Sequence, residues 1–241
     1  MSQGNTILLN LNRFGPIFSE DDKNWLLTKP KKKDLKQRQD HSISMLEDFL
    51  GKDFSKIKKD EIRRYCEITD DETHLGITPS QNYEDITNRI IQPLLLAKKY
   101  FTLGEYLSCI TLAGLSAEMM SYVVWEMNKF SMGGNILDKN EQKILFGKVD
   151  QERRIKILNL VKIIDEDNAR MLEEIRNIRN KYIHSFDIGN KQDKGNAKKV
   201  IRFALILFKN ISGINLTLEN GKQKLQVNQK FLDFIKSKIK K

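Results

Sequence analysis

Cysteine is scarce in this sequence of 241 residues, which contains only Cys66 and Cys109. Cys109 stands in an apolar run with helical spacing, so these two thiols indicate neither a disulfide framework nor a zinc site. Such a chain suits a reducing compartment, and we expect a cytoplasmic protein.

The sequence also lacks a long uninterrupted apolar run. Its most apolar segment, residues 106–127, is interrupted by Glu118 and Glu126, which leaves apolar stretches well short of the ~18 residues that a membrane span needs. The first residues, MSQGNTILLNLNRFGPIF, lack the basic flank, the longer apolar stretch and the cleavage site of a signal peptide. We therefore expect neither a membrane span nor a secretory leader.

Acidic residues are the minority charge, because lysine and arginine outnumber aspartate and glutamate by 42 to 32, which gives +10 and a pI near 9.4. A positive excess attracts polyanions, so nucleic acid is the first partner to consider. The alternative is a basic protein that binds no polyanion in particular. With 39% hydrophobic and 31% charged residues, the chain can form a core, and we expect one compact body with an appended subdomain.

Residues 1–83 carry weak local signals, and we expect an N-terminal segment of mixed helix with a possible edge strand. Residues 6–12 alternate loosely between apolar and polar, as an edge strand does. Residues 41–51 have helical spacing, and Gly51 is a plausible stop. The apolar face of that helix consists of Ile43, Leu46 and Leu50.

Two further stretches of the N-terminal segment are rich in charge. Residues 29–39 are strongly basic, and a solvated face or loop explains them better than a dedicated binding arm. Residues 69–85 gather acids, glycine and proline, which predicts a long loop or a boundary. His74 stands among the acids of this loop, but no regular spacing directs them toward one ion, so we expect no metal site.

From residue 84 to residue 212 the apolar residues recur with helical spacing, which predicts a mainly α fold built as an antiparallel helical bundle. Pro93 should kink or break the first helix. The longest helix, 104–130, carries small residues that let neighbours approach closely, so we place it at the centre, ended by Gly133 and Gly134. The other bundle helices are expected at 151–164, which should be well buried, and at 168–184 and 196–211.

Residues 213–241 change period and predict a β-hairpin followed by a basic helix, 228–241, both packed on the bundle. The two strands flank Asn220-Gly221, a turn whose residues both need positive φ. Because an isolated hairpin is marginal in water, we expect a third strand, which residues 6–12 could supply. The expected cross-strand pairs are Leu216 with Leu225 and Ile214 with Val227.

The helix expected at 168–184 ends in RNKYIH, which gathers basic, amide and imidazole side chains. In helical projection Asn180 and His184 are neighbours on the polar side, whereas Arg179 flanks the apolar stripe, about 140° from His184. Arg179 and His184 can therefore converge only if the helix ends or bends near residue 183, or if a second copy of the chain completes the site.

RNKYIH resembles the signature of the HEPN superfamily (higher eukaryotes and prokaryotes nucleotide-binding), in which an arginine, usually a polar residue, a short spacer and a histidine lie near the end of a bundle helix. The resemblance covers residues 84–212. It implies a homodimer that brings two motifs together and cleaves RNA without a metal or cofactor, with Arg179, Asn180 and His184 as the catalytic residues. A toxin or a host-defence effector against viruses would fit, with RNA, a second copy of the chain and a regulatory protein as partners.

Those residue types suit the chemistry that the resemblance implies. Attack of a ribose 2′-hydroxyl on its neighbouring phosphate requires removal of a proton and stabilisation of added negative charge. A histidine titrates near neutrality and an arginine presents paired donors, so His184 would exchange the proton and Arg179 would hold the phosphate oxygens. Asn180 would orient the substrate or His184. Arg176 and Lys181 would bind RNA as supporting contacts, and the products should carry a 2′,3′-cyclic phosphate.

His184 and Arg179 also have purely structural explanations. A cationic His184 is stabilised by the negative end of a helix, and Arg179 can lie at the edge of the core with its head in water. For Glu118, a place at the bundle edge is favoured over a pair with a motif arginine. The corresponding functional alternative is a non-catalytic helical module that binds RNA, a nucleotide or a protein partner.

Overall fold

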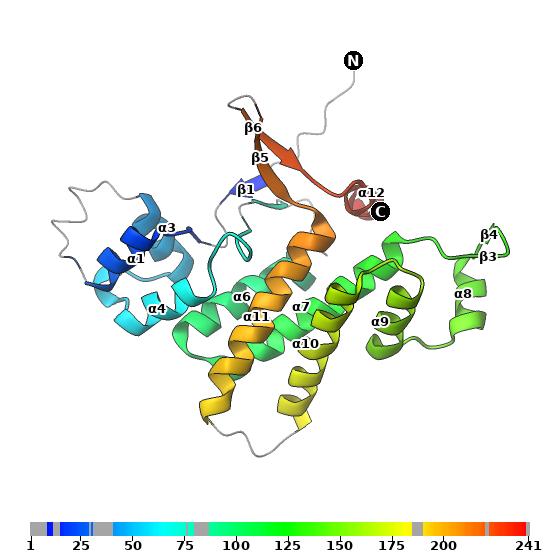
Figure 1. Ribbon diagram of the computed structural model, residues 1–241, viewed down its shortest axis with the longest axis horizontal. Helices are drawn as coiled ribbons and strands as arrows, with labels where there is room; N and C mark the ends of the chain where they lie inside the picture. The colour runs from blue at the N-terminus through cyan, green and yellow to red at the C-terminus, as the bar shows by residue number, and fades with distance from the viewer. Residues whose placement is uncertain are drawn as a thin grey trace.

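The computed structural model describes residues 9–11, 15–28, 30, 41–75, 77–79, 87–184, 190–219 and 222–239. The fold is mainly α, with a helical bundle and a small β-hairpin near the C-terminus, as the sequence predicts (Figure 1). The helices of the bundle are α6 (Gln92–Leu103), α7 (Tyr106–Met127), α9 (Gln151–Leu160), α10 (Glu166–His184) and α11 (Asn190–Ser212).

Helix α7 is the centre of the bundle and packs against α6, α9, α10 and α11. Small residues allow this close packing, because Ala113, Gly114, Ser116 and Ala117 are all buried. Among the described helices, α7 alone is long and apolar enough to cross a membrane, and more than half of that apolar stretch is buried inside the bundle. Its apolar surface is therefore used largely for packing against its neighbours.

Pro93, which was expected to kink or break the first helix, lies where the helix changes type. A π-helical stretch, Thr87–Ile91, leads into α6, and Pro93 occupies the first turn of α6. A proline there loses no hydrogen bond, because the first N–H groups of an α-helix have no partner within the helix.

The segment between α7 and α9 differs from the prediction. Helix α7 ends at Met127 rather than at Gly133 and Gly134, which instead form the positive-φ turn between β3 (Ser131–Met132) and β4 (Asn135–Ile136). Helix α8 (Lys139–Phe146), which sequence reasoning did not anticipate, follows. It begins at a capping box: the side chain of Asp138 accepts from the backbone N–H of Glu141, whose carboxylate accepts in return.

The prediction that 151–164 forms a well-buried helix was wrong in two respects. Helix α9 ends at Leu160, and the chain leaves the helix at Val161. The side chain of Leu160 is 79% exposed, and only Gln151, Ile155 and Leu158 of this helix are buried. Helix α9 contacts the bundle mainly through α7 and α10, so one narrow stripe suffices to attach it.

The apolar stripe predicted for 196–211 is confirmed in α11, where Val200, Ala204, Leu207 and Phe208 are buried. The hairpin is also confirmed, because β5 (Asn215–Glu219) and β6 (Lys222–Gln226) are antiparallel. The strand pairs run from Asn215 with Gln226 to Glu219 with Lys222 and include the predicted pair Leu216 with Leu225; Ile214 and Val227 lie just beyond them, and Asn220-Gly221 lies outside the described residues. Helix α12 (Gln229–Ile239) buries Phe231 and Ile235, with Leu232 only partly covered.

The described part of residues 6–12 does not supply the third strand that was expected for this hairpin. Strand β1 (Leu9–Leu11) pairs with β2 (Ile77–Pro79), so this part of 69–85 is extended backbone rather than loop. The described sheets are therefore separate two-stranded pairs. Alternation in residues 6–12 fits any antiparallel neighbour, which is why the pattern could not choose the partner.

The N-terminal helices α1 (Glu20–Leu27), α3 (His41–Leu50) and α4 (Lys59–Glu67) enclose a core of their own. The predicted face of α3 is confirmed, with Ile43, Leu46 and Leu50 buried. Leu95 of α6 packs against this second core, and α4 contacts α6. Apart from Pro30, the basic run 29–39 lies outside the described residues.

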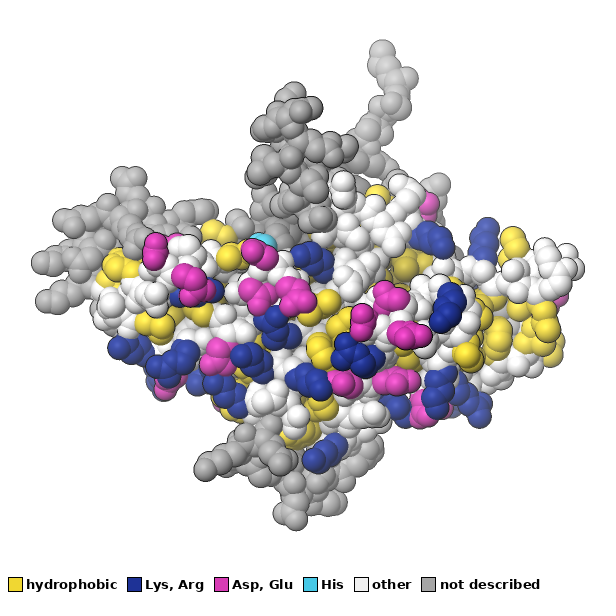
Figure 2. All heavy atoms as spheres, in the orientation of Figure 1, with side chains coloured by type: hydrophobic (Ala, Val, Ile, Leu, Met, Phe, Trp, Pro, Cys, Tyr) yellow, Lys and Arg dark blue, Asp and Glu magenta, His cyan; other side chains and the backbone are white. Residues whose placement is uncertain are grey.

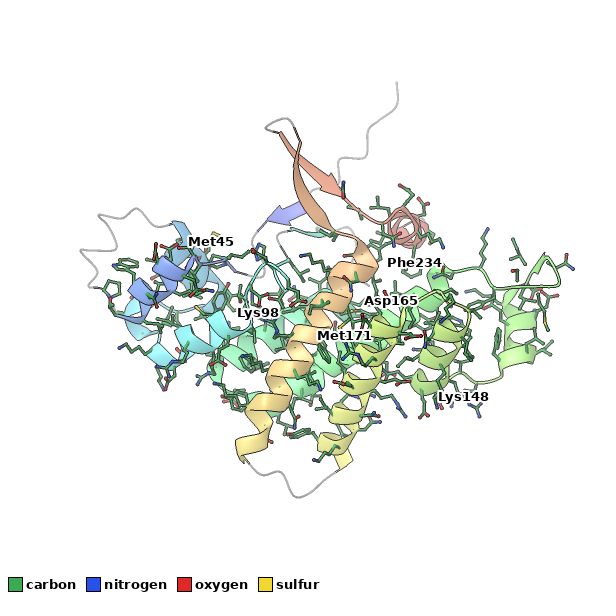
Figure 3. The ribbon with its side chains drawn as sticks, viewed as in Figure 1. Met45, Lys98, Lys148, Asp165, Met171 and Phe234 are labelled. Atoms are coloured by element: carbon green, nitrogen blue, oxygen red, sulfur yellow. The ribbon has the colours of Figure 1, made fainter. Side chains whose placement is uncertain are left out.

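A buried lysine of the bundle helix α6 reaches the aromatic rings of the N-terminal core. Lys98 of α6, labelled in Figure 3, is fully buried, and its ammonium lies 4.7 Å from the ring centroid of Tyr65 and 5.5 Å from that of Phe49. Burial lowers the pKa of Lys98 to about 7.

Candidate nucleic-acid interface

Helix α10 carries the motif residues and is helical through His184. Its apolar stripe faces the core: Met171, Ile175 and Tyr182 are buried, and Ile178 packs against the same core. The side chain of Arg179 leaves this helix toward α7. The side chain of His184 lies outside the described residues, so its convergence with Arg179 stays a prediction.

Arg179 crosses α7 at a glycine. A Cβ atom added to Gly114 would lie only 2.5 Å from Cδ of Arg179 and 2.9 Å from its Cγ. Any larger residue at 114 would displace the aliphatic stem. The side chain of Arg179 is consequently only 16% exposed.

Three side chains hold the guanidinium of Arg179. Nη1 donates to Oε2 of Glu118 at 2.6 Å, while Nη2 donates to Oε1 of Gln151 at 3.2 Å and to Oδ1 of Asn180 at 3.4 Å. Nε of Arg179 is buried and has no partner among the described residues. The pair with Glu118 corrects the favoured sequence interpretation: this carboxylate, on α7, binds the motif arginine.

Gln151 is a site residue that sequence reasoning missed. It is the first residue of α9, directly after the helix cap Asp150, and is only 8% exposed. Nothing in a local pattern connects residue 151 with residue 179. The contact exists because α9 packs beside both α7 and α10.

Arg176 and Lys181, the two residues predicted to bind RNA as supporting contacts, differ in their surroundings. Arg176 contacts the carboxylate of Glu152, which also accepts from Lys156 at 2.7 Å. These two cations lower the pKa of Glu152 below its usual value, with the Lys156 hydrogen bond as the larger cause. Lys181 is exposed. Of the two predicted supporting contacts, Lys181 is thus open to solvent, whereas Arg176 already has a carboxylate partner.

Charges of both signs are interspersed on the face shown in Figure 2, where lysines and arginines alternate with acids. The net charge of +10 is therefore not gathered into one basic patch on that face.

No cluster of three or more potential metal ligands occurs among the described residues. His74 is partly buried, and burial lowers its pKa to about 4, with the charges of Lys98 and Lys209 adding to the shift.

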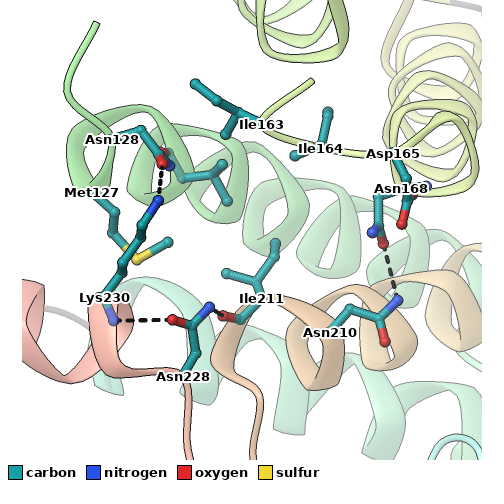
Figure 4. A pocket seen from close by; sticks show the side chains of 11 residues that line it. Met127, Asn128, Ile163, Ile164, Asp165, Asn168, Asn210, Ile211, Asn228 and Lys230 are labelled. Carbon is teal, nitrogen blue, oxygen red and sulfur yellow. Dashed lines mark hydrogen bonds between the residues drawn. The ribbon is translucent and has the colours of Figure 1, made fainter. Parts of the chain in front are cut away.

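Two adjoining hollows lie at the C-terminal end of α7, away from Gly114 and Glu118, where Arg179 meets that helix. Their volumes are about 200 and 670 Å³, and both are lined by Met127, Asn128 and Lys230. In Figure 4 Lys230 reaches Asn128, to whose Oδ1 it donates at 3.1 Å. None of the residues around the guanidinium of Arg179 lines either hollow.

The arrangement can hold one arginine in a fixed orientation next to an amide, with an acid as its counter-ion. An approaching phosphate would have to share Arg179 with Glu118, because the carboxylate accepts at Nη1.

Comparison of the chain with protein-family models, with curated proteins and with solved structures finds no match.

Proposed function

We propose that this protein is a metal-independent endoribonuclease of the HEPN type, acting as a homodimer on RNA. The observation that carries the proposal is Arg179 of RNKYIH, held by Glu118, Gln151 and Asn180, with His184 five residues further along the same helix. A toxin or host-defence effector is the biological role that we infer for such an enzyme.

In the proposed reaction, His184 takes the proton of a ribose 2′-hydroxyl while the oxygen attacks the adjacent phosphorus. The bond from phosphorus to the 5′-oxygen breaks, and that oxygen leaves with a proton, so the products are a 2′,3′-cyclic phosphate and a 5′-hydroxyl. Arg179 stabilises the negative charge that builds on the phosphate oxygens. Asn180 orients the phosphate or the imidazole.

Glu118 and Gln151 act in this proposal as positioning residues. They fix the guanidinium before substrate arrives, so that less side-chain entropy is lost on binding. The side chain of Glu118 is 39% exposed. A phosphate can therefore displace this side chain from Arg179, or share Arg179 with it, without opening the bundle.

A second copy of the chain completes the proposed site, because Arg179 and His184 leave a straight helix about 140° apart. Large apolar side chains are exposed on the two helices that carry the site, namely Leu107 and Leu115 of α7 and Ile183 of α10. Exposed apolar surface of this kind is suited to a partner. Light scattering should give twice the mass of the chain.

The second candidate is a non-catalytic helical module that binds RNA, a nucleotide or a protein. One observation favours it: Glu118 and Gln151 already hold Nη1 and Nη2 of Arg179, and an arginine can have such partners for a structural reason alone.

Incubation of the purified chain with mixed RNAs in EDTA tests the proposal. We expect cleavage with cyclic-phosphate ends, reduced about 10²- to 10⁴-fold in His184→Ala and about 10²- to 10³-fold in Arg179→Ala. Arg170→Ala is the matched control, since Arg170 is exposed on α10 and, among the described residues, its ion-pair partner is Asp167, three residues earlier.

Cleavage that survives both site variants would assign the activity elsewhere and refute the proposal. A folded wild type that cuts none of the RNAs would also refute it, and RNA binding by that inert protein would favour the second candidate. Circular dichroism of Arg179→Ala shows whether a loss of activity reflects unfolding.

A further inference from the structure

An exposed tyrosine lies beside the candidate site. Tyr122 follows Glu118 by four residues on α7, so the two side chains are neighbours on one helix face, with Cβ atoms about 6 Å apart. The Tyr122 side chain is 41% exposed. A large aromatic ring is thus presented to solvent one helical turn from the carboxylate that holds Arg179.

Arg154 of α9 lies against this ring. The central guanidinium carbon is 5.4 Å from the ring centroid, within the range of a cation–π contact. Nη1 of Arg154 donates to Oγ of Ser121 at 3.0 Å, and Ser121 in turn donates to the carbonyl of Glu118 at 2.7 Å. These bonds fix the arginine, and with it the orientation in which it meets Tyr122.

We propose that Tyr122, backed by Arg154, is a stacking platform for an unpaired base of single-stranded RNA whose phosphate lies at Arg179. The proposal rests on the proposed function and names the form of RNA that the site takes. Proteins that read single-stranded RNA stack its bases on aromatic rings and on arginine planes, and attract its backbone with positive charge. Here the ring, the stacked arginine and the phosphate-binding arginine occupy adjacent positions on three packed helices.

Duplex RNA is not the partner that this surface fits. A paired base is stacked on both sides within the helix and offers no free face to a protruding ring. Tyr122 contributes through its ring alone, whereas Arg154 adds charge, so the two side chains should affect binding in different ways.

The test uses the full chain carrying His184→Ala, in EDTA, with a fluorescent single-stranded RNA of mixed sequence. Tyr122→Ala should weaken binding about tenfold or more, whereas Tyr122→Phe keeps the ring and should stay within about twofold of the parent. Tyr122→Leu, which keeps apolar area without a flat ring, should resemble Tyr122→Ala. Ile144→Ala, at an exposed apolar residue of α8, is the control.

Salt dependence separates the ring from the charge. The slope of log affinity against log salt should be unchanged in Tyr122→Ala, because no charge is lost, and smaller in Arg154→Ala. Duplex RNA of the same sequence should bind more weakly and should not distinguish Tyr122→Ala from its parent.

Equal affinity of Tyr122→Ala and its parent for single-stranded RNA would overturn the platform, as would a Tyr122→Phe variant as weak as Tyr122→Ala. The absence of any RNA binding would overturn it too. Because binding is measured without cleavage, an inert wild type whose binding depends on the ring refutes the ribonuclease and keeps the platform. RNA cleavage that does not depend on residue 122 refutes the platform and keeps the ribonuclease.

Discussion

Arg179 differs from Arg170 of the same helix in where its partners come from. Arg170 pairs with Asp167 on the same exposed helix surface, an arrangement worth little in water. Arg179 is bound by residues of α7 and α9 and packs its stem against Gly114. An arginine held by three helices keeps one orientation, which a phosphate-binding role requires.

Lys98 is the residue whose protonation should affect stability at neutral pH and above. Burial lowers its pKa to about 7 in the folded protein, from a usual value of 10.5. Between these values the unfolded chain holds a proton that the folded chain has released. Its contribution to the free energy of unfolding therefore rises with pH from about 7 to about 10.5, by at most about 1.4 kcal/mol per pH unit.

Lys98→Met should remove this rise. Urea unfolding of the wild type and the variant at pH 7, 8, 9 and 10 measures it, and the difference between them should grow in favour of the wild type as the pH increases. Lys99→Met controls for the loss of a lysine on the same helix. Parallel curves for wild type and Lys98→Met would show that the ammonium is not held in a low-dielectric site.

At the scale of the elements, hydrogen bonds between polar side chains connect the end of α10 with the beginning of α11. The hydroxyl of Tyr182 donates to Oδ1 of Asp193 at 2.8 Å and accepts from Nδ2 of Asn196 at 2.9 Å. Asp193 is buried, so its carboxylate depends on such donors. This link holds the end of α10, two residues before His184, against the beginning of α11.

Tyr182→Phe should destabilise the protein by about 1–3 kcal/mol, because it removes a donor from a buried carboxylate without removing the ring. In a chain of this size that corresponds to a fall in Tm of several degrees. Differential scanning fluorimetry measures it. Tyr100→Phe is the control, since the Tyr100 hydroxyl has no hydrogen bond to a described residue, and equal melting of both variants would contradict the anchoring role.

At the scale of the whole molecule, ion pairs connect the N-terminal segment with α11. The guanidinium of Arg202 binds Asp70 through Nη1 and Oε2 of Glu72 through Nη2, the latter at 2.8 Å. Lys194 of α11 also pairs with Glu67 of α4. Burial alone would raise the pKa of Asp70, but hydrogen bonds from Arg202 and Thr73 outweigh it and lower that pKa.

Because the folded-state pKa of Asp70 is lowered, its stabilisation is present above the usual pKa of an aspartate and is lost as the pH falls through the folded value. Arg202→Ala should remove most of this acid dependence and accelerate hydrogen exchange in residues 68–75. Mass spectrometry follows the exchange. Arg63→Ala breaks an exposed pair with Asp60 and should leave exchange there unchanged; identical exchange in both variants would exclude the connection.

Local patterns in the sequence determined most helices, the hairpin and the side of α10 that carries the motif. Helical spacing and the Asn220-Gly221 signal act over a few residues, so α7, α10, α11 and the pair Leu216 with Leu225 could be predicted without knowledge of the fold. RNKYIH likewise marked the helix end on which the proposed site is built, because its residue types and their order are visible in the chain.

The tertiary structure alone decided which distant groups meet. Glu118 and Gln151 lie 61 and 28 residues from Arg179 in the chain, and no spacing rule connects them. The pairing of β1 with β2, the exposure of Leu160 and the position of Tyr122 beside Arg154 depend in the same way on how helices and strands pack. Periodicity specifies which face of a helix is apolar, whereas the partner of that face is set by the free energy of packing the whole chain.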